Sequence, residues 1–480
     1  MSNLKTAPTA LLWILIPCLL AFSCTPDYRA VRPADLVGDY LFDCRKYDAV
    51  FLVHIEEAGG ELVALWDIVD DPVPLERVAP GSHLFRTRSV RVREFEFAFE
   101  RGEDGEIDAL ALSRDDGEIT LRGERTTEPT AALRAYRREI PSPYRYRRPI
   151  VCGDGWETAD IHGSGIDAAA IEDLVNELAA NHPWMHSILI VRDGRIVLEE
   201  YLNGCDPCKL HRLQSVTKSL TSILVGLAIR EGCIRSVDDP ICRYLPEYDS
   251  LLTGPKRDVT IRHLLTMSAG FEWNEMETYY TDSERCDPYI AERGDDYLGY
   301  VFAKPLAKEP GSSWYYNSGY PNILGHIIEK TCGMNIVEFS YRYLLDPVGV
   351  KRFQLFDIAG EDRPSCAGGC RMTSRDMARL GQLYLDGGKW NGRQVVPASW
   401  VEASVTSYYD TPYDTGYGYL WKTMTTPDGA HDFFFASGTG GQFIVCIPDL
   451  DTVVVTTARY NTDRGDALAG VLLEKLMPAL

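Results

Sequence analysis

A serine and a lysine lie three residues apart, at Ser215 and Lys218, where a long apolar pattern begins. The pattern predicts a helix that ends near Gly232 and buries one face. Residues three apart lie on the same side of a helix, about one turn from each other, so the lysine amine can reach the serine hydroxyl. A serine becomes a nucleophile when a base takes its proton, and a neutral lysine amine is such a base. The pair therefore predicts acyl transfer through a serine ester.

Spacing alone is a weak signal for this chemistry. The same spacing occurs at Ser2 and Lys5, near the start of the chain, and a surface helix can carry both residue types by chance. The assignment therefore depends on what surrounds Ser215. Its place at the first turn of the predicted helix also exposes it to the positive end of the helix dipole.

The surrounding sequence resembles a known family. The stretch HRLQSVTKSLTSILVGLAIREG (residues 211 to 232) resembles the nucleophile helix of serine β-lactamases and penicillin-binding proteins, especially the branch of class C β-lactamases, esterases and 6-aminohexanoate-dimer hydrolases. Further blocks extend the resemblance, in order, over roughly residues 160 to 480. They are VDDPICRYLPEY (237 to 248), TIRHLLTMSAGFEWNE (260 to 275) and a long stretch that begins GGCRMTSRDMARLG at residue 368.

The resemblance also implies a Tyr-x-Asn motif. This tripeptide begins at Tyr201, Tyr315 and Tyr320, and the context favours Tyr315, which follows a Pro-Gly turn and precedes an apolar helical pattern. The resemblance implies that Tyr315 shares a proton network with Lys218, and that Asn317 orients Lys218 or the substrate carbonyl. The alternative is an aromatic loop that only packs on a helical lobe.

The third family element is a strand that usually carries a cation beside the serine. Here the stretch FFASGTGG places Ala436 or Ser437 at that position. We expect Ser437, Gly438 and Thr439 to form this part of the site, with an oxyanion hole made by the N–H groups of Ser215 and of Thr439 or a neighbour. Without the cation, neutral esters or linear amides fit better than β-lactams or peptides with a free carboxylate.

Other chemistry-bearing residues have more ordinary explanations. Trp273 and Trp314 flank the matched motifs and either line a substrate pocket or pack in the core. We expect structural roles for the histidines and acidic residues elsewhere, and no metal or other cofactor is required. The closely spaced cysteine pairs favour local disulfides or buried thiols over zinc. These residues are His263, His326, Glu272 and Asp376, and the pairs Cys205/Cys208 and Cys366/Cys370.

The period of the apolar pattern changes along the chain. Residues 36 to 138 alternate between apolar and polar positions around Asp-Gly and Gly-Gly turns, which predicts a small antiparallel β-barrel or half-barrel with an accessory role. Residues 139 to 159 read as a linker. Residues 160 to 480 carry strands near both ends and helices between them. The fold class we expect is α+β: an antiparallel sheet flanked by helices with an inserted all-helical lobe, as in serine β-lactamases.

The first residues indicate export. Residues 1 to 24 combine Lys5 with an apolar run that is too short to cross a bilayer, which is typical of a signal peptide. Cys24 ends this stretch and resembles the lipidated cysteine of a bacterial lipoprotein. We therefore expect a periplasmic or cell-envelope protein that contacts the membrane only through a lipid anchor. The net charge of −21 argues against a nucleic-acid partner.

The sequence is compatible with three functions. The first is an exported serine hydrolase that cleaves esters or linear amides, with Ser215 as nucleophile, Lys218 as base and Tyr315 in the proton relay. The second is a penicillin-binding, D-Ala-peptidase-like or β-lactamase protein that acts on cell-wall peptides or β-lactams. The third is a non-catalytic ligand-binding protein that keeps the fold. Stable acylation by a β-lactam would favour the second over the first.

Overall fold

The computed structural model describes residues 32–44, 49–58, 61–66, 73–79, 82–87, 95–114, 120–126, 140–278, 282, 284–355, 364–459 and 465–480. The predicted signal peptide and Cys24 lie outside the described residues. Within the described ranges, no helix has the length and apolar character needed to span a membrane.

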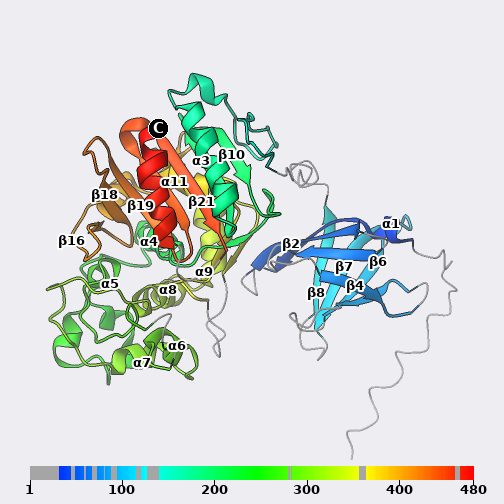
Figure 1. The fold of residues 1–480 in the computed structure, drawn as a ribbon. Coiled ribbons are helices and arrows are strands. Elements are labelled where there is room, and N and C mark those ends of the chain that lie inside the picture. Colours follow the sequence, from blue (N-terminus) through cyan, green and yellow to red (C-terminus); the bar gives the residue numbers. More distant parts are fainter. Residues whose placement is uncertain are drawn as a thin grey trace, which may run out of the picture.

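The N-terminal part is an antiparallel barrel of strands β1 to β8 (Figure 1). Each strand pairs with its neighbour in the chain, and β1 (Gly38–Cys44) pairs with both β2 (Ala49–Ala58) and β8 (Thr120–Thr126), which closes the ring. The others are β3 (Glu61–Trp66), β4 (Val73–Arg77), β5 (Leu84–Thr87), β6 (Phe95–Arg101) and β7 (Ile107–Arg114). Alternate side chains fill the interior, among them Tyr40, Phe97 and Leu110. The expected small β-barrel is therefore present.

The barrel continues into the larger part of the chain through one strand pair. The start of β2 pairs with β12 (Phe353–Leu355), which pairs with β13 (Cys370–Met372), and β13 pairs with β11 (His211–Arg212). Strand β11 ends three residues before Ser215. The strand that leads into the predicted nucleophile is thus anchored at the edge of this sheet.

A second antiparallel sheet forms the centre of the larger part. Its strand order is β10-β9-β21-β20-β19-β18-β17-β16. Strands β9 (Met185–Arg192) and β10 (Arg195–Tyr201) form a hairpin at Asp193-Gly194, as the sequence predicts, and β9 pairs with β21 (Thr452–Ala458) from the far end of the chain. The others are β16 (Tyr409–Asp410), β17 (Gly416–Tyr417), β18 (Lys422–Thr425), β19 (Asp432–Gly438) and β20 (Gln442–Ile447).

Helices cover both faces of this sheet. On one face lie α4 (Val216–Arg230) and α11 (Ser374–Leu385), which pack on apolar side chains such as Val453 and Val455. On the other face lie α3 (Ala168–Asn181) and the C-terminal helix, which pack on the intervening residues such as Val454. The C-terminal helix comprises α13 (Gly465–Val471) and η8 (Leu472–Leu476). Because side chains alternate along a strand, central strands such as β9, β20 and β21 contribute to both cores.

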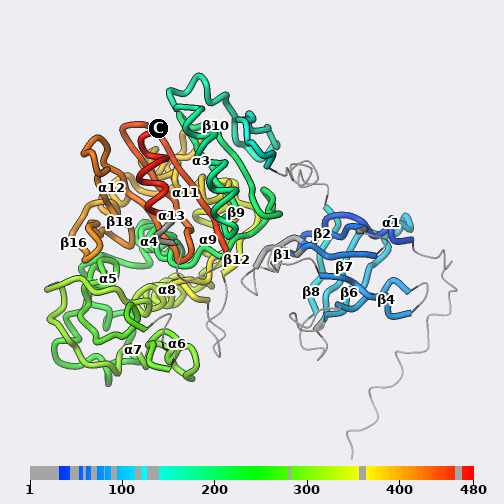
Figure 2. The backbone as a smooth tube through the Cα atoms, viewed as in Figure 1, coloured from blue at the N-terminus to red at the C-terminus, as the bar shows by residue number. Residues whose placement is uncertain are grey.

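The segment between α4 and β12 forms the helical lobe, which Figure 2 shows beside one end of the sheet. It contains α5 (Ile261–Leu265), α6 (Asp287–Glu292), α7 (Tyr297–Ala303), α8 (Gly319–Cys332) and α9 (Ile336–Ser340). This is the predicted sheet interrupted in sequence by a helical insertion, so the expected fold class is confirmed. The exact domain boundaries at 138, 139, 159 and 160 stay predictions.

Candidate active site

Ser215 and Lys218 lie together at the start of α4. Ser215 is the N-cap residue of the helix, and the Lys218 Nζ donates a hydrogen bond of 2.9 Å to the Ser215 Oγ. The Nζ also donates a bond of 2.8 Å to the carbonyl oxygen of Ala367. These bonds hold the amine beside the hydroxyl, as the three-residue spacing predicts.

The environment of Lys218 favours its neutral form. The side chain is 3% exposed, and this burial lowers its pKa from 10.5 to about 8. The positive charge of Lys422 lowers the pKa further, whereas the negative charge of Glu275 raises it. A substantial fraction of the amine is therefore neutral near physiological pH, which a general base requires.

The tyrosine at the site is Tyr316, which corrects the assignment of Tyr315. The Tyr316 hydroxyl donates a hydrogen bond of 2.7 Å to the Ser215 Oγ. The Lys218 Nζ lies 4.9 Å from the centre of the Tyr316 ring. Tyr315 is 41% exposed, does not line the cavity around Ser215, and is fixed by a bond from its backbone N–H to the Met267 carbonyl. The two consecutive tyrosines point to different sides, so only one of them reaches the serine.

Asn317 takes a supporting position and does not contact the site. It is fully buried, and its Oδ1 accepts a hydrogen bond of 2.7 Å from the Gly319 N–H at the start of α8. It does not line the cavity. The prediction that Asn317 orients Lys218 or the substrate carbonyl is therefore wrong: the asparagine holds the helix start that follows Tyr316.

The third motif lies against the nucleophile as expected. Ser437, Gly438 and Thr439 all line the cavity that contains Ser215. A Cβ atom at Gly438 would lie 2.1 Å from the Leu213 carbonyl oxygen and 3.1 Å from the Ser215 nitrogen. Only glycine permits this approach of strand β19 to the start of α4. The backbone of Gln214, just before the serine, has a φ of 51°, in the left-handed region that costs energy for a residue with a Cβ.

A buried carboxylate positions the tyrosine segment. Glu275 accepts hydrogen bonds of 2.8 Å from the Ser318 N–H and 2.5 Å from the Ser318 hydroxyl. It accepts a third, of 2.8 Å, from the Trp273 indole N–H. Trp273 is buried and does not line the cavity, whereas Trp314 does. The sequence does not single out Glu275, although it ends one of the blocks that carry the family resemblance.

The cavity around Ser215 has a volume of about 790 Å³. Ser215, Lys218, Tyr316 and Glu275 form part of its wall. Two cations that the sequence analysis did not identify also line it, Arg212 from β11 and Lys422 from β18. Lys422 lies opposite Phe435 on the neighbouring strand. Its role has no local sequence signal, because it follows from the pairing of β18 with β19.

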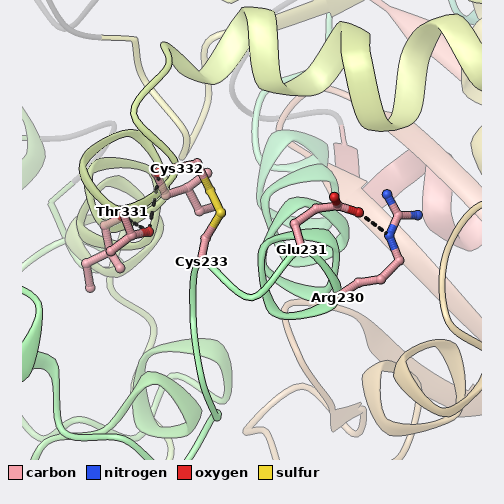
Figure 3. Close-up of a disulfide and its surroundings, with 7 residues drawn as sticks. Arg230, Glu231, Cys233, Thr331 and Cys332 are labelled. Carbon is pink, nitrogen blue, oxygen red and sulfur yellow. Dashed lines mark hydrogen bonds and ion pairs between the residues drawn. A yellow bond between two sulfur atoms is a disulfide. The ribbon is translucent and has the colours of Figure 1, made fainter.

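A disulfide connects the two helices whose first turns form the site. Cys233 follows the end of α4, and Cys332 is the last residue of α8; the bond between them closes a sequence separation of 99 residues (Figure 3). The predicted close pairs behave differently: Cys366, Cys370 and Cys208 are buried, and Cys205 is partly buried. The disulfide between Cys233 and Cys332 therefore joins residues far apart in the sequence, and the spacing of the cysteines does not predict this pairing.

The remaining candidates have structural contacts. His263 forms a capping box with Thr260 at the start of α5, and His326 lies 3.4 Å from Glu247. Asp376 accepts a bond from the Thr373 hydroxyl and lies 3.2 Å from Arg379. The backbone N–H of Glu272 bonds the Pro305 carbonyl. None of these four residues lines the cavity around Ser215.

The sequence is similar to known proteins over the part of the chain that contains Ser215. The Beta-lactamase family model matches residues 181–475, which is more than half of the chain. The 6-aminohexanoate-dimer hydrolase of Paenarthrobacter ureafaciens is 30% identical over 293 residues, covering 57% of this chain and 72% of the relative. The lovastatin esterase of Penicillium rubens is 26% identical over 196 residues, or 37% of this chain and 46% of the relative.

The fold is also similar to solved structures. A putative 6-aminohexanoate-dimer hydrolase from Bacillus anthracis superposes with a TM-score of 0.53 at 22% identity. The similarity covers 62% of this chain and 79% of that chain. At this identity the similarity supports the fold, and the chemistry must be argued from the side chains around Ser215.

Proposed function

Because this chain belongs to the β-lactamase family, whose relatives named above are hydrolases, we propose that it is a serine hydrolase that cleaves esters or linear amides through an acyl-enzyme on Ser215. The observation that carries the proposal is the convergence of a buried amine and a phenol on one hydroxyl. Lys218 and Tyr316 both hydrogen-bond the Ser215 Oγ, at 2.9 Å and 2.7 Å.

The reaction begins when neutral Lys218 accepts the proton of Ser215 and the serine oxygen attacks the substrate carbonyl. Ser215 and Thr439 both line the cavity, and their N–H groups stabilise the negative charge on the carbonyl oxygen. Tyr316 gives its proton to the leaving alcohol or amine and recovers one from Lys218. Water then attacks the acyl-enzyme, with the same groups removing its proton, and releases the acid.

A probe that reacts with activated serines tests this proposal. The purified protein and its Ser215→Ala variant are treated with a fluorophosphonate, and then with a panel of p-nitrophenyl esters and linear amides. We expect labelling and turnover in the wild type and neither in the variant. Ser222→Ala is the matched control, because Ser222 is buried on the same helix and does not line the cavity. Equal labelling of wild type and Ser215→Ala would disprove the nucleophile, and unlabelled wild type would favour a non-catalytic binding protein.

A second candidate function is action on cell-wall peptides or β-lactams. The cations that line the cavity favour it, because Lys422 and Arg212 can contact the carboxylate that these substrates carry. These two cations supply the positive charge that the third family motif usually carries and that strand β19 lacks at Ala436 and Ser437. Long-lived adducts with penicillins, combined with no turnover of neutral esters, would support this candidate over the first.

We also propose that the protein is exported. The support is the signal-like sequence of residues 1 to 24, with Cys24 as a lipid attachment site. Expression of the full chain in a bacterial host, followed by cell fractionation, tests this. Cleavage of the signal peptide without attachment to the membrane would rule out the lipid anchor but support export. An uncleaved protein in the cytoplasm would overturn both proposals.

A further inference from the structure

The cavity that contains Ser215 extends beyond the catalytic residues along an apolar groove. The groove runs between the C-terminal helix and the face of the central sheet on which that helix packs. From the sheet it is lined by residues that include Phe435, Phe443 and Val445, and from the C-terminal helix by residues that include Ala469, Leu472 and Leu473. The groove and the catalytic residues thus belong to one continuous hollow of about 790 Å³.

Strand β19 connects the catalytic end to the apolar end. Side chains alternate along a strand, so Gly438 faces the start of α4 while Ser437 and Phe435 share the opposite face. Ser437 lies opposite Phe443, and Phe435 lies opposite Val445 on β20. The row that begins at Ser437 in the cavity wall therefore continues directly into apolar side chains.

The position of Tyr316 indicates which part of a substrate would occupy the groove. Tyr316 comes from the helical lobe and contacts Ser215 from that side. Because Tyr316 protonates the leaving group in the proposed reaction, the alcohol or amine must lie toward the lobe. The acyl part of the substrate then extends to the other side of the carbonyl, toward the sheet and the C-terminal helix.

We propose that this groove is the acyl-binding site, and that the preferred substrates are esters or amides of aliphatic acids with a medium or long chain. The inference rests on the proposed function, since it needs an acyl-enzyme on Ser215. Each methylene transferred from water into an apolar groove improves binding roughly three- to fourfold, so chain length becomes the main determinant of selectivity.

The test is a chain-length series. The kcat/KM is measured for p-nitrophenyl esters from acetyl to dodecanoyl with the wild type and with Ala469→Phe, which places a ring in the groove. We expect the wild type to prefer octanoyl or longer esters over acetyl by roughly 700-fold or more, because the octanoyl chain adds six methylenes. Ala469→Phe should lower kcat/KM for the long esters about tenfold or more and change the acetyl ester less than about twofold.

Val471→Phe is the matched control, because Val471 lies on the same helix and does not line the cavity. It should leave the chain-length profile unchanged. The acetyl ester reports folding in each variant, and Leu473→Trp provides a second obstruction of the groove if Ala469→Phe folds poorly. A parallel series of acetate esters with alcohols of increasing length should show much weaker selectivity.

The experiment distinguishes failure of the proposed acyl-binding site from failure of the proposed hydrolase function. One outcome is turnover that depends on Ser215 but has the same kcat/KM for every acyl chain length. Another is a chain-length profile that Ala469→Phe and Leu473→Trp leave unchanged. Either outcome would overturn the acyl-binding site and leave the proposed hydrolase function standing. Selectivity for the length of the alcohol instead of the acid would also overturn it. Absence of Ser215-dependent turnover with every ester and amide would overturn the proposed function itself.

Discussion

The Tyr316 hydroxyl lies 2.7 Å from the Ser215 Oγ, and the Tyr316 ring lies beneath the Lys218 amine at 4.9 Å. The phenol thus contacts both partners of the Ser-x-x-Lys pair. It connects the helical lobe, which supplies Tyr316, to helix α4, which supplies the other two residues. The amine and the phenol both lie within hydrogen-bond distance of the Ser215 hydroxyl, as the proposed proton relay requires.

The two neighbouring tyrosines provide a direct comparison. We expect Tyr316→Phe to lower kcat about 100-fold or more, because proton transfer to the leaving group loses its donor. Tyr315→Phe should change kcat less than about twofold, since the Tyr315 side chain does not line the cavity. Steady-state kinetics with one ester and one amide measures both effects. The opposite ranking of the two variants would restore the assignment made from the Tyr-x-Asn motif.

The rate should rise with pH through the pKa of Lys218. Only the neutral amine acts as a base, and its fraction grows as the pH increases through about 8. We therefore expect kcat/KM to increase about tenfold per pH unit well below this value and to level off above it. A profile that is flat between pH 6 and pH 9 would contradict the role of Lys218.

Charge-removing variants on either side of Lys218 should move this profile in opposite directions. Glu275 raises the pKa of Lys218 and Lys422 lowers it. Glu275→Gln should therefore shift the midpoint to lower pH, and Lys422→Gln should shift it to higher pH. Trp273→Phe removes one hydrogen bond to Glu275 and retains its charge. It should leave the midpoint in place, so a shift in that variant would indicate a change of structure.

The sequence predicts the fold more completely than the site. Local period and turn residues predicted the barrel, the hairpin at Asp193-Gly194 and the helix after Ser215, because these elements depend on neighbouring residues. The pairing of Ser215 with Lys218 also followed from one helical turn. Tyr316 did not, because the motif gave a choice between consecutive tyrosines and only the path of the chain after Met267 decides which side chain faces the serine.

The other missed residues reach the site through long-range packing. Lys422 enters the cavity wall because β18 pairs with β19, and Glu275 binds Ser318 across 43 residues of sequence. The groove beside the C-terminal helix is likewise a product of tertiary packing. Apolar residues at Phe435 and Leu472 read as ordinary core positions in the sequence, and only their position around one hollow distinguishes them.

Gly438 should be required for activity. Its replacement by alanine would place a Cβ 2.1 Å from the Leu213 carbonyl oxygen, so strand β19 would have to move away from Ser215. We expect Gly438→Ala to lower kcat/KM about 100-fold or more, because the N–H of Thr439 would leave the proposed oxyanion hole. Gly368→Ala is the matched control: Gly368 lines the same cavity and has open space for a Cβ. Similar kinetics for the two variants would remove Thr439 from the proposed mechanism.

The disulfide between Cys233 and Cys332 should stabilise the protein without taking part in catalysis. It joins the far ends of α4 and α8, whose first turns carry Lys218 and follow Tyr316. Closing a loop of this length lowers the entropy of the unfolded chain, so the Cys233→Ala/Cys332→Ala variant should lose about 3 to 5 kcal/mol of unfolding free energy. Urea unfolding with and without a reducing agent measures this loss.

The wild type should lose stability on reduction, whereas the stability of the double variant should not change. Both proteins should keep the same kcat below their unfolding transitions. Equal stability of wild type and variant under oxidising conditions would show that the bond adds nothing to the fold.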